Sequence, residues 1–354
     1  THQVGHSERT DAVIEPYISE QWFLKMTDLA KPALKAVKSG EINFYPARWT
    51  KTYDHWLENI KDWCISRQLW WGHRIPVWYR NDEIYCDVNP PEGDGWKQDE
   101  DVLDTWFSSW LWPFATLGWP EETDDLKRFY PTQDLSTGPD IIFFWVARMI
   151  MAGYYFIGEK PFSNVYFHGL IRDSQGIKMS KSLGNGVDPR DIIKTHGADA
   201  LRLTMVQLAT GTQDVRLSID LICPHSGKSF EPTFISSHTG HKVMAPKQCC
   251  PDDDSKHMST VYGNLIGETT DCKESPLAMN TSTRFDIGRN FANKFWNASR
   301  FALMNVTDPS PSVDPSTRPA VDQWILSKVQ VAIDRINQGI RTYRFSDVAD
   351  ALYD

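Results

Sequence analysis

The sequence lacks several features that would assign it to a compartment or a partner. It has 6 cysteines among 354 residues, and so few thiols in a chain of this length favour a reducing, cytoplasmic setting over a disulfide framework. Its net charge of −9 gives no excess of positive charge, so composition does not indicate nucleic acid as a partner, although a local basic groove can still bind RNA. The opening residues show no pattern of a secretory signal peptide.

Long uncharged hydrophobic runs are also missing. The apolar stretch 141–157 contains Arg148 and many aromatic side chains, and it is shorter than the roughly 20 residues that a membrane span needs. We therefore predict a buried helix there and no membrane association. The chain has 15 tryptophans and 17 phenylalanines, which predict aromatic pockets, and its length allows two or three hydrophobic cores.

One short basic string gives the clearest chemical signal. Residues 178–182 read Lys-Met-Ser-Lys-Ser, between Gly176 and Gly186. Two lysines and two hydroxyls can bind and neutralise phosphate oxygens where charge develops as pyrophosphate leaves, and the glycines allow the loop to close. The alternative is a solvated basic turn, which is what most short lysine-serine runs are. We call residues 178–186 the signature loop.

The signature loop is predicted to lie between a strand and a helix. Residues 165–171 form an apolar, aromatic run that is typical of a buried strand. After the loop, Asp188 is a suitable N-cap, with Pro189 at the first helical position and Asp191 as an acidic third residue. Gly197 is a suitable end for this helix.

The last third of the chain is predicted to be mainly helical, after an irregular segment. Residues 287–306 and 321–336 have apolar side chains at helical spacing. Residues 219–285 break every pattern, and three interpretations compete for them. A zinc site could use Cys223, His225, His241, Cys249 and Cys250.

The spacings of these candidate ligands are irregular, and no CxxC pair is present, which disfavours zinc. Residues 226–229, Ser-Gly-Lys-Ser, imitate the end of a phosphate-binding P-loop, but Ile222 stands where that motif requires its first glycine. The sequence therefore favours a disordered insertion or a translated non-coding stretch such as a retained intron.

Several longer strings carry a resemblance to a known family. The chain resembles the valyl members of the class I aminoacyl-tRNA synthetases over most of residues 5–217 and 287–354. The strings are Trp56–Pro76, Asp99–Ser109, Asp140–Met149, Asn290–Arg300 and the signature loop itself. Isoleucyl and leucyl enzymes share parts of these strings, whereas Leu69–Gly72 and Leu111–Pro120 look specifically valyl.

The resemblance implies an α/β fold, with an incomplete Rossmann-type catalytic domain followed by the start of an α-helical anticodon-binding bundle. Residues 1–15 would end an editing domain, and 16–217 would be the second half of the catalytic domain with its connective segments. Residues 218–286 would be an atypical, disordered insertion, and 287–354 would begin the bundle. Thr1 opens the chain without Met, so we expect an internal fragment.

The resemblance also implies an activity and its residues. Such an enzyme joins valine to ATP, supplied with Mg²⁺, and transfers the valyl group to tRNA(Val), and we expect a cytoplasmic monomer without a bound metal. The implied catalytic residues are Lys181 and, less directly, Lys178. The implied ATP-binding residues are His168, Gly169, Met179, Ser180, Lys181 and Ser182. The implied valine-binding residues are Trp106, Asp140, Ile141 and Trp145.

Each of these residues also has a structural alternative. His168 could be a structural histidine, Asp140 only an N-cap, and the tryptophans only core. Arg67 is as well explained by an internal ion pair as by a tRNA phosphate contact. A small apolar valine pocket discriminates against close analogues by only about 10- to 200-fold, as is known for valyl enzymes, which fits a family with a hydrolytic editing domain.

The chain departs from the family pattern in three places. The first class I motif, of His-Ile-Gly-His type, does not occur in the 354 residues, so we predict that the chain alone does not activate valine. Pro139 and Ile177 stand where the family usually has other residues, which puts fine positioning in doubt. Two alternative functions stay open, a noncatalytic tRNA-binding or structural fragment and an enzyme specific for isoleucine.

Overall fold

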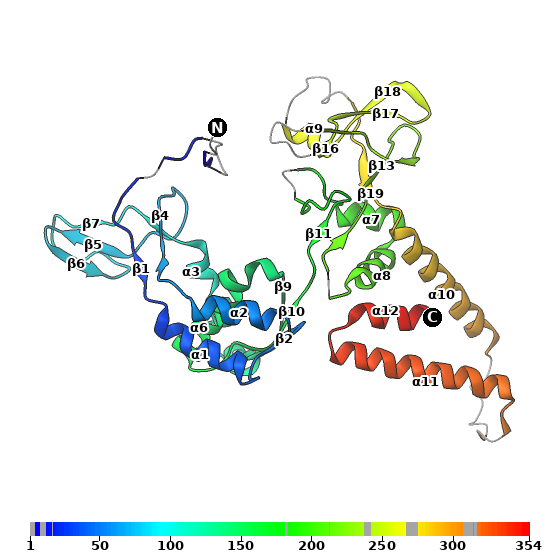
Figure 1. Ribbon diagram of the computed structural model, residues 1–354, viewed down its shortest axis with the longest axis horizontal. Helices are drawn as coiled ribbons and strands as arrows, with labels where there is room; N and C mark the ends of the chain where they lie inside the picture. The colour runs from blue at the N-terminus through cyan, green and yellow to red at the C-terminus, as the bar shows by residue number, and fades with distance from the viewer. Residues whose placement is uncertain are drawn as a thin grey trace. The chain divides into compact units, whose positions relative to one another are not determined.

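The computed structural model shows a chain of two compact units, Thr1–Val165 and Tyr166–Asp354 (Figure 1). It describes residues 4–7, 12–15, 17–180, 183–211, 213–236, 242–266, 275–306, 314 and 317–354. Both units mix short strands with helices, and the second ends in long helices.

The first unit has a helical core beside several small sheets. Its helices are α1 (Thr27–Lys38), α2 (Trp49–Glu58), α3 (Thr105–Ser109), α4 (Trp112–Ala115), α5 (Asp124–Phe129) and a continuous helical stretch made of η1 (Pro139–Ile141), η2 (Ile142–Ala147), α6 (Arg148–Ala152) and η3 (Gly153–Ile157). Its strands are β1 (Phe23–Leu24), β2 (Asn43–Tyr45), β3 (Trp63–Cys64), β4 (Ser66–Arg67), β5 (Val77–Arg80), β6 (Glu83–Cys86), β7 (Lys97–Gln98), β8 (Val102–Leu103), β9 (Thr132–Thr137) and β10 (Phe162–Phe167).

Helical spacing explains how α1 and α2 pack together. Ala30 and Ala33 of α1 are buried three residues apart, so small side chains on one face allow close approach. The buried Tyr53 of α2 donates a hydrogen bond from its hydroxyl to the Ala33 carbonyl at 3.1 Å. Strand β10 lies between β2 and β9 in a three-stranded sheet.

The helical stretch Pro139–Ile157 passes a test for membrane spans by length and composition, and half of its most apolar window is buried inside the fold. Core helices of water-soluble domains pass the same test, so this observation is weak evidence for a membrane. Arg148 lies in the middle of the stretch and is 4% exposed. Its contacts within the first unit, described below, account for a charge in this apolar helix.

The second unit carries the signature loop between a parallel strand pair and two helices. Strand β11 (Ile171–Arg172) pairs in parallel with β12 (Val215–Arg216). Helix α7 (Pro189–His196) begins and ends where the sequence predicts, because the Asp188 side chain accepts a hydrogen bond from the Arg190 amide at 2.8 Å, and Gly197 has a φ of 91°. Helix α8 (Ala198–Leu208) follows directly.

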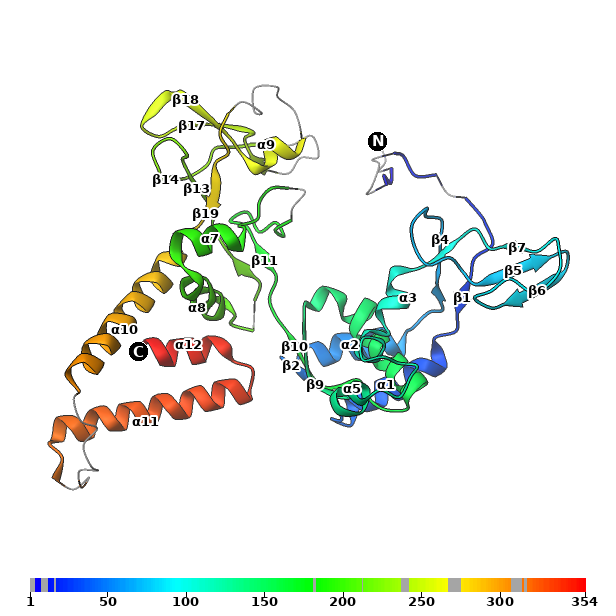
Figure 2. The ribbon, with the colours of Figure 1, turned by 180° about the vertical axis from the view of Figure 1, so that it is seen from behind.

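The C-terminal helices agree with the helical prediction. They are α10 (Phe285–Asn305), α11 (Ala320–Arg341) and α12 (Phe345–Tyr353). Helix α10 lies against α8, and the close approach depends on Gly288, where a Cβ would lie 2.6 Å from the Ala200 carbonyl oxygen. Helices α11 and α12 pack as an antiparallel pair that both ribbon views show (Figures 1 and 2).

Residues 219–285 form a small module, so the predicted disorder is wrong for their described part. Their elements are β13 (Asp220–Ile222), β14 (Ser229–Phe230), β15 (Phe234–Ser236), β16 (Lys242–Met244), β17 (Lys247–Cys250), β18 (Asp253–Ser259), α9 (Val261–Ile266) and β19 (Met279–Thr281). A buried cluster holds it together, made of Ile219, Leu221, Cys223, Met244, Cys250, Met258 and Ala278. Most of its strands have only two to four residues, too few for a periodic pattern to show in the sequence.

Candidate functional site

The first unit carries all four residues implied for valine, on α3 and on the helical stretch η1–η2. Trp106 of α3 stacks on Phe144 of η2, with ring centroids 5.8 Å apart and planes at 25°. Trp145 of η2 donates from its indole nitrogen to the Ser109 carbonyl at 3.0 Å. Ile141 and Asp140 lie at the start of the same helical stretch, where Asp140 is exposed. The aromatic rings could enclose a small aliphatic side chain, and a carboxylate at a helix start could bind an ammonium group. Together these groups suit a small aliphatic amino acid.

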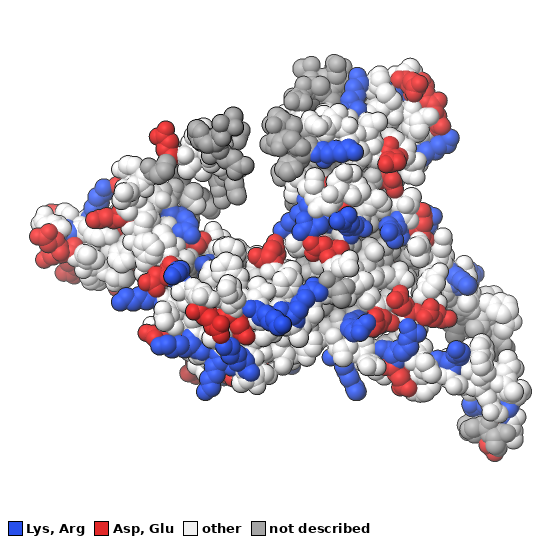
Figure 3. Space-filling model, in the orientation of Figure 1, with Lys and Arg blue, Asp and Glu red and all other residues white. Residues whose placement is uncertain are grey.

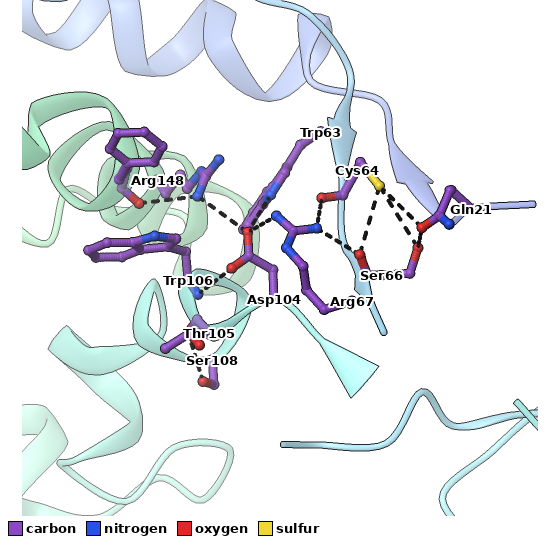
Figure 4. Close-up of polar contacts among 11 residues, drawn as sticks. Gln21, Trp63, Cys64, Ser66, Arg67, Asp104, Thr105, Trp106, Ser108 and Arg148 are labelled. Carbon is purple, nitrogen blue, oxygen red and sulfur yellow. Dashed lines mark hydrogen bonds and ion pairs between the residues drawn. The ribbon is translucent and has the colours of Figure 1, made fainter. Parts of the chain in front are cut away.

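The buried carboxylate of Asp104 holds the backbone of Trp106 in place (Figure 4). Asp104 is the N-cap of α3, and its Oδ1 accepts from the Trp106 amide at 3.2 Å. Its Oδ2 accepts from Trp63 Nε1 at 2.9 Å and from Arg67 Nη2 at 2.8 Å. Arg67 thus forms an internal ion pair, which confirms one of the two interpretations of this residue.

Arg148 completes this charge cluster from the long helical stretch. Its guanidinium lies 3.5 Å from the centroid of the Trp63 ring and 4.0 Å from Asp104 Oδ2. Burial lowers the pKa of Arg148 to about 10, while the Asp104 carboxylate opposes the shift. The group stays charged at neutral pH, and its interaction with the tryptophan face is the cation–π type.

The signature loop is fixed from within by Asp173 and Asn185. Asp173 Oδ1 accepts from the amides of Gln175 and Ile177, at 3.0 and 2.9 Å. Asn185 donates to Asp173 Oδ2 at 2.8 Å and accepts from the Ser180 amide at 2.9 Å. Both side chains are at most 9% exposed, so these hydrogen bonds are shielded from water and hold the loop in one shape.

Of the residues implied for ATP, the structure describes His168, Gly169, Met179 and Ser180, with Lys178 beside them. Lys181 and Ser182 lie outside the described residues. Lys178 and Ser180 line a cavity of about 950 Å³ with Asp188, Arg190 and apolar residues of the module. Met179 also lines this cavity and packs against two buried clusters. Its side chain therefore supports the loop and contributes an apolar part of the cavity wall.

His168 and Gly169 follow the end of β10. His168 is exposed, and its ring Nδ1 lies 3.1 Å from the Gly169 carbonyl oxygen. A Cβ on Gly169 would lie 2.5 Å from the Gln213 carbonyl oxygen, so this glycine is required for a backbone approach. The carboxyl ends of strands are where open α/β sheets bind ligands, which agrees with a ligand role for the exposed imidazole.

The described cysteines and histidines of the module form pairs and no larger cluster of metal ligands. Cys249 Sγ lies 3.4 Å from His257 Nδ1, and His225 Nε2 lies 2.9 Å from the His257 carbonyl oxygen. His241 lies outside the described residues. Within the described part of the chain, no group of three or more His, Cys, Asp or Glu side chains could hold a metal.

Sequence reasoning missed the side chains that position the site. Asp104, Arg148, Asp173 and Asn185 are all buried polar residues, and none was identified as part of the site. The one available signal was the charge of Arg148 within an apolar run. A buried charge needs a partner, but the sequence does not say which carboxylate supplies it.

Comparison with known proteins places the chain in a family. The model of the class I tRNA synthetases for I, L, M and V matches residues 6–93 and 91–218. The chain therefore belongs to the class I tRNA synthetases. The second match ends at the residue before the module begins, which is consistent with an addition to the family's common fold.

Two similar relatives are valine–tRNA ligases. The chain is 45% identical over 361 residues to the valine–tRNA ligase of Thermotoga maritima, covering 100% of this chain and 34% of that protein. It is 46% identical over 359 residues to the valine–tRNA ligase of Bacillus subtilis, covering 99% of this chain and 34% of that protein. The chain thus spans about a third of the length of these relatives.

Solved structures give the fold. Methionyl-tRNA synthetase of Mycobacterium tuberculosis, in complex with methionyl-adenylate, superposes with a TM-score of 0.59 at 16% identity, over 99% of this chain and 53% of that chain. The ternary complex of an Agrobacterium radiobacter LeuRS with tRNA and LeuAMS gives 0.55 at 16% identity, over 86% of this chain and 38% of that chain. The chain has the Rossmann-type fold of class I synthetases with a helical C-terminal part, as the sequence predicts.

Proposed function

We propose that this chain belongs to the catalytic machinery of a valine–tRNA ligase. The observation that carries the proposal is the 45% identity to a valine–tRNA ligase across the full chain. The aromatic wall of Trp106 and Trp145 with Asp140, and the framed signature loop, support it. An oxygen of the valine carboxylate attacks the α-phosphorus of ATP, the bond to the β-phosphate oxygen breaks, and pyrophosphate leaves with the electron pair.

The residues then have separate roles in this reaction. Asp140 accepts hydrogen bonds from the valine ammonium, and the tryptophans and Ile141 enclose the two methyl groups. Lys181 and Lys178 neutralise the charge on the leaving pyrophosphate, an electrostatic contribution that grows toward the transition state. His168, Gly169 and Ser180 contact the nucleotide, which enters as its Mg²⁺ complex.

In the second step the valyl group moves to tRNA(Val). A hydroxyl of the terminal adenosine attacks the carbonyl carbon of valyl-adenylate, and AMP leaves. Lys and Arg are interspersed with Asp and Glu over each unit in the view of Figure 3, so tRNA binding would depend on local groups more than on bulk charge. We further propose a monomer that acts in the cytoplasm.

Valine-dependent exchange between ATP and labelled pyrophosphate tests the proposal. The full-length protein that contains this sequence should exchange with valine and much more weakly with isoleucine, because a pocket shaped for valine leaves no room for an added methylene. Preference for isoleucine would contradict the valine assignment. Absence of exchange with either amino acid would favour a noncatalytic role. The 354-residue chain alone should not exchange, because it contains no His-Ile-Gly-His motif.

A further inference from the structure

We propose that the module 219–285 is a clamp on the signature loop, and that Asn280 is its positioning residue. The proposal rests on the function above only for its catalytic consequence. The physical link between the module and the loop stands on contacts within the second unit.

Asn280 joins strand β19 to the loop backbone. Its Nδ2 donates to the Gly186 carbonyl at 2.7 Å and to the Gly184 carbonyl at 3.2 Å. The side chain is 3% exposed, so water does not compete for these two carbonyls. One side-chain amide thus binds two backbone carbonyls in residues 184–186, the part of the loop that follows the lysines.

Helix α9 also lies directly against this part of the loop. Gly184 has a φ of +58°, and a Cβ there would lie 2.6 Å from the Tyr262 amide nitrogen. Only glycine fits such a contact with backbone. Gly184 is therefore in contact with two parts of the module, Asn280 of β19 and Tyr262 of α9.

The buried clusters connect the module to the loop through apolar contacts. Met179 and Val187 pack against the module cluster around Leu221 and Met258. The same two side chains pack against the cluster of Ile192, Leu217 and Phe285. Because Met179 of the loop and Val187 directly after it pack against both clusters, a shift of the module would move the backbone at both ends of the loop.

The pairing of β19 with β13 fixes the position of Asn280. Strand β19 pairs antiparallel with β13, with Asn280 opposite Leu221. Leu221 is fully buried, so the register of the strand pair is fixed by the cluster. Misplacement of about 1 Å at a reacting group can cost about 100-fold in rate, so a clamp at this point has a catalytic consequence.

Hydrogen exchange tests the clamp independently of activity. In the full-length protein, peptides covering residues 171–187 should exchange slowly, and in Asn280→Asp they should exchange at least about 10-fold faster, because Asp lacks the donor and its charge faces two carbonyl oxygens. Asn264→Ala is the matched control, since Asn264 is exposed on α9 of the same module. It should leave the exchange unchanged.

Kinetics then separate positioning from mere folding. In the valine-dependent pyrophosphate exchange, Asn280→Asp should lower kcat about 10-fold, with a smaller change in the KM for ATP and an unchanged KM for valine. Equal loop exchange in Asn280→Asp and wild type would overturn the proposal. If the variant does not fold, fast exchange of the loop in the wild type would overturn it equally.

Two further outcomes are distinguishable. A wild type without valine-dependent exchange, but with a loop that loosens in Asn280→Asp, would support the clamp and contradict the proposed function. Mass spectrometry of the native protein should find peptides from 219–285. Their absence, as expected of a retained intron, would overturn the clamp and leave the proposed function intact.

Discussion

The Asp104 cluster and the signature loop are both framed by buried polar side chains, but their frames differ in kind. Around Asp104 the partners are two guanidinium groups and an indole. Around the loop the partners are the amides of Asn185 and Asn280, backbone groups, and one carboxylate, Asp173, which accepts hydrogen bonds from backbone and side-chain amides. Buried charges are costly to separate, whereas a neutral hydrogen bond contributes roughly 1 kcal/mol. The comparison indicates a rigid amino-acid pocket in the first unit and, in the second unit, a loop held by individually weaker hydrogen bonds.

Asp104→Asn removes the negative charge at the centre of the Asp104 cluster and should have the largest effect on stability. The variant leaves Arg148 buried without its counter-charge, so the free energy of unfolding should fall by about 3–5 kcal/mol. Chemical denaturation measures this loss. The matched control is Asp94→Asn at an exposed position, which should change stability by less than about 0.5 kcal/mol. Equal stability of the two variants would show that Asp104 is not the centre of the cluster.

Lys181→Ala in the signature loop should lower activity without lowering stability. We expect kcat for valine-dependent pyrophosphate exchange to fall about 100- to 1000-fold, because a charge directed at the leaving group is lost. Lys178→Ala should have a smaller effect. The control is Lys194→Ala on α7, whose side chain is 72% exposed. An unchanged unfolding midpoint in all three variants would agree with a loop that does not carry the stability.

Trp145→Phe tests how much one hydrogen bond contributes to the proposed valine pocket. The ring remains, but the hydrogen bond from its indole nitrogen to the Ser109 carbonyl is lost, so the KM for valine should rise by about 2- to 10-fold. Trp112→Phe is the control, because Trp112 is 59% exposed. A change in the KM for ATP of the same size would contradict a role confined to the valine pocket.

The smallest expected effect concerns a histidine outside both regions. Burial lowers the pKa of His196 below its usual 6.5, and the nearby Asp286 only partly offsets this. The unfolded chain therefore binds more protons between the two pKa values, and stability falls as the pH drops below about 6.5. Unfolding measured from pH 8 to 5 should show this slope in the wild type and a weaker slope in His196→Gln. Equal slopes would contradict it.

Local patterns predicted the elements that depend on local physics. The caps of α7 at Asp188 and Gly197 and the spacing of apolar residues in α10 and α11 depend on neighbours in the sequence, and the structure confirms them. Helix α2 ends at Glu58, and Trp63 lies in β3 and donates a hydrogen bond to Asp104, a partner distant in the sequence.

Other features depended on partners distant in the sequence. Asn185 and Asn280 are 95 positions apart (280 minus 185), yet both fix the signature loop. No local sequence pattern indicates that two residues so far apart hold the same loop. The disorder predicted for 219–285 was wrong in the part that the structure describes for a related reason, because its cluster is assembled from short strands whose apolar residues meet only in the folded module.

We propose above all that the full-length protein attaches valine to tRNA(Val). Aminoacylation of a tRNA(Val) transcript by the full-length protein, followed on acid gels with labelled valine, tests it most directly. We predict charging with valine that is lost in Lys181→Ala and retained in Lys194→Ala. Charging with isoleucine in preference to valine, or no charging by a folded wild type, would contradict the account.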